Sequence, residues 1–94
     1  MAKHEQRAVL TVLGRDRVGI IANVTKLLAD YNVNIEDISQ TILKDIFNMI
    51  MMVDFSKING TLEDLRADLE RLGHDLGVSI VLQQTAIFDS MHRI

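Results

Sequence analysis

The chain has 94 residues, of which 48% are hydrophobic and 24% charged, and its formal net charge is -3. That length suits one domain, because two would each be too small to bury a core. The acidic balance argues against a nucleic-acid partner, and the lack of cysteine excludes disulfides and thiolate metal sites. No apolar run approaches the roughly 20 residues that cross a bilayer, and residues 1–6 form a polar leader. We therefore expect no membrane partner and a cytoplasmic location.

The first two elements are predicted from apolar periodicity. Residues 8–13 are apolar and rich in β-branched side chains, which is typical of a strand covered on both faces. Residues 20–31 repeat apolar side chains at the spacing of one helix face. That expected stripe consists of Ile20, Val24, Leu27 and Tyr31, widened by Ile21 and Leu28. Asn32 tolerates the left-handed conformation common after helices, so we expect the helix to end there.

Two strand-like runs follow, at residues 34–43 and 47–55, with Lys44 and Asp45 between them. This spacing predicts a hairpin, although the two turn residues include no glycine. In the second run every other side chain is apolar, so one face of this strand belongs to the core. The alternating residues are Phe47, Met49, Met51, Val53 and Phe55.

A second helix and a last strand complete the chain. Thr61 precedes Asp64 by three residues, as a helix-capping side chain would. The expected apolar stripe of this helix consists of Leu62, Leu65, Leu69, Leu72 and Leu76. We place the end of the helix at Gly77, the last strand at residues 78–88 and a short tail at residues 89–94.

The predicted order is β-α-β-β-α-β over a single domain, residues 1–94. Two right-handed βαβ crossovers with this order give an α+β fold of the ferredoxin-like sandwich type. Such a sandwich has a four-stranded antiparallel sheet with two helices on one face. The first and third strands should be central, and the second and fourth should form the edges.

A charged turn framed by two glycines joins the first strand to the first helix, at residues 14–20. The start of a helix has free backbone N–H groups and the positive end of the helix dipole, so it suits a small anion. No nucleophile, metal cluster or phosphate-loop lysine accompanies this turn. The chemistry therefore indicates binding and not catalysis, and we expect neither an enzyme nor a cofactor.

The pattern Gly14-x-Asp16-Arg17-x-Gly19-Ile20, with Asn34-Ile35 at the start of the second strand, resembles the ACT domain, a regulatory module. Residues 34–41 (NIEDISQT) and 86–89 (AIFD) are similar, more narrowly, to small bacterial and archaeal proteins made of one ACT domain. The resemblance implies that an amino acid or similar effector binds between two domains, through the first turn and the second strand. It also implies a regulated enzyme or DNA-binding domain as the partner, although these 94 residues contain none.

The resemblance implies a ligand site at Gly14, Asp16, Arg17, Val18, Gly19, Ile20, Asn34 and Ile35. Asp16 has two interpretations: a residue that caps the first helix, or a partner for the ammonium group of a bound amino acid. In the second interpretation, backbone N–H groups at residues 18–20 hold the ligand's carboxylate. A side chain at position 19 would crowd either a ligand or the contact between helix and sheet. Asn34 can both donate to and accept from such a ligand.

Other functions find less support. An acylphosphatase-like hydrolase has the same topology, and Arg15, Arg17 and Asn48 could serve it, yet the fuller pattern of that loop is missing. A module that binds proteins only is the other alternative. The histidines lie far apart in the sequence, without metal-ligand spacing, so we expect no metal site.

The uncovered face of the predicted sheet is more apolar than a solvated face should be. By alternation, this face carries Val9, Thr11, Ile50, Met52, Val81 and Thr85. The second strand is also an edge without proline or a cluster of lysines to block pairing. Both features predict a homo-oligomer of at least two chains.

Overall fold

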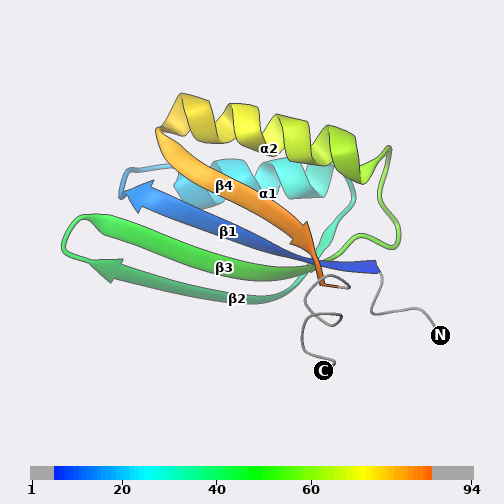
Figure 1. Cartoon of the computed structure of the whole chain (residues 1–94), viewed down its shortest axis with the longest axis horizontal. Coiled ribbons are helices and arrows are strands. Elements are labelled where there is room, and N and C mark those ends of the chain that lie inside the picture. Colours follow the sequence, from blue (N-terminus) through cyan, green and yellow to red (C-terminus); the bar gives the residue numbers. More distant parts are fainter. Residues whose placement is uncertain (1–5, 86–94) are drawn as a thin grey trace, which may run out of the picture.

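The computed structural model of the chain describes residues 6–85. Its elements are β1 (Arg7–Arg15), α1 (Ile20–Asp30), β2 (Asn34–Leu43), β3 (Ile46–Asp54), α2 (Leu62–Leu76) and β4 (Val78–Gln84). The strands form one antiparallel sheet in the order β2-β3-β1-β4, and both helices lie on one face of it (Figure 1). The predicted fold class, strand order and edge strands are confirmed.

The core lies between the sheet and the two helices. Alternate side chains of the central strands face it and are buried, as the period of two predicts. These are Ala8, Leu10 and Val12 of β1 and Phe47, Met49, Met51 and Val53 of β3. Phe55, the last residue of the predicted alternation, lies just past β3 and packs against the edge of the core.

The buried face of α1 differs from the predicted stripe. Ile20, Val24 and Leu28 are buried, whereas Leu27 and Tyr31 are only half-buried and Ile21 is exposed. These three buried residues follow a spacing of four, so one narrow line of side chains faces the sheet. Leu27 and Tyr31 pack against the margin of the core, as the stripe predicted, whereas the prediction that Ile21 widens the buried face was wrong.

The predicted helix ends agree with the structure. The side chain of Thr61 accepts a hydrogen bond from the N–H of Asp64 at 3.0 Å, which confirms the cap of α2. Gly77 ends α2 with a φ of 74°, in the left-handed region that glycine adopts without strain. Asn32, with a φ of 59°, turns the chain after α1 toward β2.

The bounds of β1 and β4 differ from the predictions by more than one residue, whereas β3 begins and ends one residue earlier than predicted. β1 continues through Gly14, which pairs with Phe47 of β3 and Val78 of β4, so this glycine belongs to the sheet and not to the turn. β4 ends at Gln84, whose partner is near the start of β1, and Thr85 follows the strand. The rest of the predicted strand and the tail, residues 86–94, lie outside the described residues.

A hydrogen bond joins the two helices. The hydroxyl of Tyr31 donates to a carboxylate oxygen of Asp68 at 2.5 Å. This hydrogen bond, with burial and the negative charge of Asp68, raises the pKa of Tyr31 to about 12. An ordinary tyrosine has a pKa of about 10, so the folded state holds the proton more tightly than the unfolded state does.

We expect this contact to stabilise the fold fully below pH 10 and to be lost as the pH rises from about 10 to about 12. The Tyr31→Phe variant has no hydroxyl, so it has no stabilisation from this contact to lose as the pH rises. The melting temperature of the wild type should therefore fall more steeply above pH 10 than that of the variant. Thermal melts at pH 8 and pH 11 measure the difference, and parallel slopes would contradict it.

Candidate functional site

The turn between β1 and α1 begins its helix with a glycine. Gly19 is the residue before the helix, its φ is 96°, and no side chain of residues 6–85 caps the helix. Among the described residues, a Cβ at this position would approach only the side-chain nitrogen of Asn23, at 3.2 Å. The left-handed backbone therefore requires glycine here, and the expected crowding between helix and sheet does not occur.

Asp16 does not cap α1, so that interpretation was wrong. It lies three residues before Gly19, and its backbone N–H donates to the carbonyl oxygen of Asp45 at 2.8 Å. This bond holds the turn against the hairpin between β2 and β3. Within residues 6–85 the exposed carboxylate of Asp16 makes no hydrogen bond or ion pair. Its negative charge is available to a ligand.

Arg17 contacts the second helix. Its guanidinium donates to the carbonyl oxygen of Leu76, the last residue of α2, at 3.1 Å. A cation suits this position because the carbonyl end of a helix is the negative end of its dipole. Arg17 therefore connects the turn to α2. Arg15 lies 3.9 Å from the carboxylate of Asp45, and both side chains are exposed.

The next residues of the turn differ in what they expose. The side chain of Val18 is 98% exposed, whereas that of Ile20 is buried in the core. Ile20 can therefore offer a ligand only its backbone. The N–H groups of Val18 and Gly19 have no backbone acceptor among the described residues. Free N–H groups at a helix start are the usual means of holding a carboxylate.

Asn34 and Ile35 lie at the opposite end of the sheet from this turn. Asn34 pairs with Asp54, and Asp54 pairs with Arg7 at the start of β1. The turn instead follows Arg15, at the other end of β1. Asn34 is exposed, and Ile35 is half-buried against the core. One chain therefore does not bring the two halves of the predicted site together.

The sequence and structure can now be compared with known proteins. The family model described as the ACT domain matches residues 6–83. The chain belongs to the ACT domain family. A UPF0237 protein of Methanopyrus kandleri is 47% identical over 88 residues, which is 94% of this chain and 98% of that protein. A UPF0237 protein of Methanococcus maripaludis is 51% identical, over 95% of this chain and 99% of its own length.

A solved structure agrees. The ACT domain protein from Streptococcus pneumoniae superposes with a TM-score of 0.77 at 40% identity, over 88% of this chain and 93% of that one. ACT domains typically act as regulatory modules that bind a ligand. The fold and its family therefore match the resemblance seen in the turn and second strand.

In this ACT domain Asn34 lines a polar hollow of about 480 Å³. Its lining includes Asp54 and Lys57, which the sequence analysis missed because they lie on a different strand and loop. The side-chain amide of Asn32 donates to the carbonyl oxygen of Lys57 at 2.9 Å and holds that loop in place. The start of β2 thus offers an amide, a carboxylate and a cation in one hollow.

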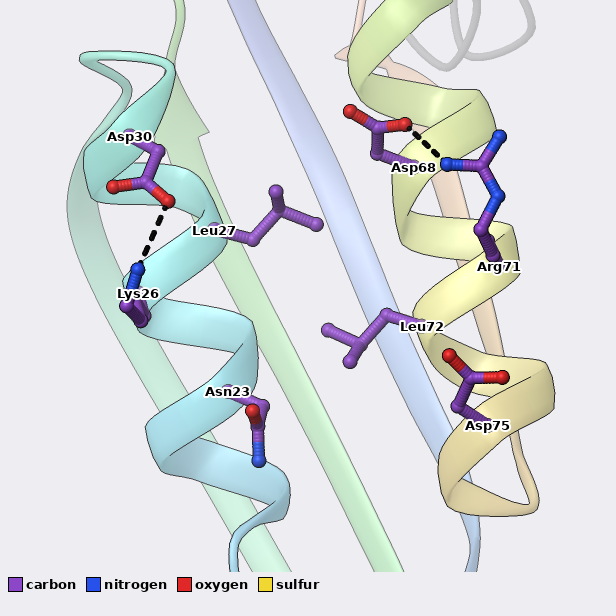
Figure 2. A pocket seen from close by; sticks show the side chains of 8 residues that line it. All are labelled: Asn23, Lys26, Leu27, Asp30, Asp68, Arg71, Leu72 and Asp75. Carbon is purple, nitrogen blue, oxygen red and sulfur yellow. Dashed lines mark hydrogen bonds and ion pairs between the residues drawn. The ribbon is translucent and has the colours of Figure 1, made fainter.

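A second hollow of the ACT domain, about 320 Å³, lies between the helices. Figure 2 shows Leu27 and Leu72 pointing toward one another across it. Four of the neighbouring charges pair within their own helices, with Lys26 to Asp30 at 3.3 Å and Arg71 to Asp68 at 3.0 Å, and Asp75 also lines the hollow. Because most of these charges already have partners, the interhelical hollow is a weaker candidate than the turn.

The metal and acylphosphatase alternatives can be compared with the arrangement of residues 6–85 in this ACT domain. No group of three or more histidine, aspartate or glutamate side chains there could hold a metal ion. Asn48 pairs with Leu13 on the uncovered face of the sheet, whereas Arg17 reaches α2 on the helix face. Two of the residues named for the acylphosphatase alternative therefore lie on opposite faces of the sheet. No described helix is long and apolar enough to span a membrane.

Proposed function

We propose that this ACT domain is a regulatory module that binds an amino acid or similar small effector between two copies of the chain. The turn at residues 16–19 of one copy supplies one half of the site, and Asn34 of the other copy supplies the second. The bound effector then alters how the pair acts on a regulated enzyme or transcriptional regulator.

One observation carries this proposal: the two halves lie at opposite ends of the same sheet, beside an unpaired edge. β2 has a neighbour on one side only, and its side chains are almost all exposed. In an antiparallel pair of two β2 strands, the start of one lies beside the end of the other. Leu43 ends β2 at the end of the sheet where the turn lies, so the partner copy's Asn34 comes near that turn.

The chemistry of both halves suits a zwitterion. Free N–H groups of Val18 and Gly19 would hold a carboxylate, and the unpaired carboxylate of Asp16 would hold an ammonium group. Asn34 can donate and accept at once. Lys57, in the same hollow as Asn34, adds a cation that favours effectors with an acidic or polar side chain.

A thermal-shift screen with the standard amino acids tests ligand binding directly. A ligand that binds only the native state raises the melting temperature with its concentration. We expect at least one amino acid to do so. If none binds, even at millimolar concentration, the module works through protein contacts alone and the proposal fails.

Asp16→Asn should weaken binding of the amino acid found by that screen about tenfold to a hundredfold. The reason is that a hydrogen bond to a charged group contributes about 1.5–3 kcal/mol. Since Asp16 does not cap α1, the melting temperature without ligand should stay unchanged. Asn34→Ala should weaken binding less, because a neutral hydrogen bond is lost. Titration calorimetry measures both variants.

Mixed dimers test whether two copies build the site. A dimer of one Asp16→Asn chain and one Asn34→Ala chain contains one site with both changes and one site with neither. Two different affinity tags allow such dimers to be purified. We expect half of their sites to bind with wild-type affinity. If each site belongs to one chain, no site recovers that affinity, which would contradict the proposal.

A further inference from the structure

The two edges of the sheet differ in what covers them. On β4, the side chain of Arg66 in α2 donates to the carbonyl oxygen of Leu82 at 3.2 Å. The carbonyl oxygen of Val78 lies against Gly73 of the same helix, 2.7 Å from where a Cβ would stand. Helix α2 therefore covers the outer side of β4, beside which it lies in Figure 1. Among residues 6–85 no helix or loop bonds the backbone of β2, so β2 is the edge that can accept another strand.

The backbone of β2 presents three residues at this edge. The N–H of Ile38 points away from β3 and donates to the side chain of the preceding residue, Asp37, at 2.9 Å. Backbone groups alternate in direction along a strand, so Gln40 and Ile42 also present their N–H and C=O groups outward. A β-bulge before Asp37 interrupts this pattern, and the hairpin turn ends it. Regular pairing with another strand is therefore confined to residues 37–43.

We propose that two copies pair through β2 in one register, with Gln40 of each copy on the two-fold axis. The proposal rests on the β2 pairing of the proposed function and specifies which residues meet. Around such an axis Ile38 of one copy lies opposite Ile42 of the other. All three outward residues then find partners, which gives about six hydrogen bonds because each such pair exchanges two. Centring the pair one residue earlier or later sets one outward residue against the bulge or the turn and leaves about four.

The side chains of Ile38 and Ile42 favour the same register. They lie on the helix side of the sheet, beside Met51 and Phe47 of β3, yet are 44% and 50% exposed. With Gln40 on the axis, each of these isoleucines meets an isoleucine of the other copy, and such cross-strand pairs stabilise a sheet. A shift of the axis by one residue would put Gln40 beside one isoleucine and the bulge or the turn beside the other.

This register also brings the two halves of the proposed site together. The start of one β2 strand runs past the end of the other, so residues 34–36 of one copy lie beside Lys44 and Asp45 of the second. In that second copy the N–H of Asp16 donates to the carbonyl oxygen of Asp45 at 2.8 Å. A shift of the axis by one residue moves the partner strand by two residues, or about 7 Å. That distance exceeds the length of a hydrogen bond, so the register decides whether Asn34 completes the site.

Cysteine scanning of β2 tests the register. The chain has no cysteine, so a single introduced cysteine can form a disulfide only with the same position of another copy. Opposite Cα atoms of a hydrogen-bonded pair lie about 5.5 Å apart, which suits a disulfide. We expect Gln40→Cys to give a covalent dimer under mild oxidation roughly tenfold faster than Ser39→Cys or Thr41→Cys, whose opposite numbers lie farther apart. Ile38→Cys and Ile42→Cys should cross-link when mixed with each other but not alone.

Non-reducing electrophoresis measures the cross-linked fraction, and circular dichroism confirms that each variant is folded. If Ser39→Cys or Thr41→Cys cross-links faster than Gln40→Cys, the register is overturned whereas the β2 pairing of the proposed function stands. If none of the five variants cross-links, alone or mixed, both the register and the β2 pairing are overturned. If Gln40→Cys does not fold, the mixture of Ile38→Cys with Ile42→Cys decides.

Ligand binding by the locked dimer tests whether this register builds the site. The oxidised Gln40→Cys dimer should bind the amino acid found by the thermal-shift screen with wild-type affinity, because both halves of each site are held together. Titration calorimetry measures that affinity. A locked dimer that does not bind, beside a wild type that does, would overturn the register as the one that completes the site.

Discussion

Leu28→Ala is expected to lower the free energy of unfolding by about 2–5 kcal/mol. Leu28 is fully buried on the line of α1 that faces the sheet, so its removal loses apolar burial and leaves a cavity. A domain of this size is stabilised by only about 5–15 kcal/mol in total. The substitution therefore removes a large share of that stability.

Leu27→Ala is the matched control, one residue away on the same helix. Leu27 is half-buried beside the open interhelical hollow, so its loss should cost about 1–2 kcal/mol. Urea unfolding monitored by circular dichroism measures both variants. A larger loss for Leu27→Ala than for Leu28→Ala would contradict the observed orientation of α1.

The fold could be predicted because the spacing of apolar side chains and the capping residues depend on the backbone conformation of a single segment. The alternation from Phe47 onward specifies which face of β3 is buried, and Thr61 with Asp64 marks the start of α2. The order of the six elements then leaves few topologies, since crossovers are right-handed. The positive φ of Asn32 and of Gly77 likewise follows from residue type.

The site could be predicted only in part because its contacts join residues far apart in the sequence. The bond from Arg17 to Leu76 spans 59 residues, and that from Tyr31 to Asp68 spans 37. No pattern within one segment indicates such pairs. The separation of Asn34 from the turn follows from the register of three strands, which becomes visible only in the assembled sheet.

Asp16 illustrates a local error. Aspartate is one of the residues preferred as a helix cap, so capping of α1 was one of the two interpretations of Asp16. The helix begins instead after Gly19, whose left-handed backbone makes the entry without a side chain. Asp16 is thereby released from a structural role, which strengthens the case for testing it as a ligand contact.

Gly73→Ala is expected to destabilise the protein by about 1–3 kcal/mol, although alanine is normally preferred to glycine within a helix by about 1 kcal/mol. Gly73 is buried in α2 where the helix crosses β4. A Cβ there would lie 2.7 Å from the carbonyl oxygen of Val78 and 3.2 Å from Ile80. A backbone oxygen cannot move aside as the end of a side chain can, so the helix itself must shift. Gly73→Val should cost more.

Gly77→Ala separates this clash from the general cost of replacing a glycine. A Cβ at position 77 meets no atom within 4 Å, so only the left-handed backbone, with a φ of 74°, opposes the change. That strain is about 1–2 kcal/mol and does not depend on the contact between α2 and β4. Hydrogen exchange should therefore show weaker protection in β4 for Gly73→Ala, whereas Gly77→Ala leaves β4 protected. An increase in stability for Gly73→Ala, measured by urea unfolding, would mean that α2 does not approach β4 as closely as the structure indicates.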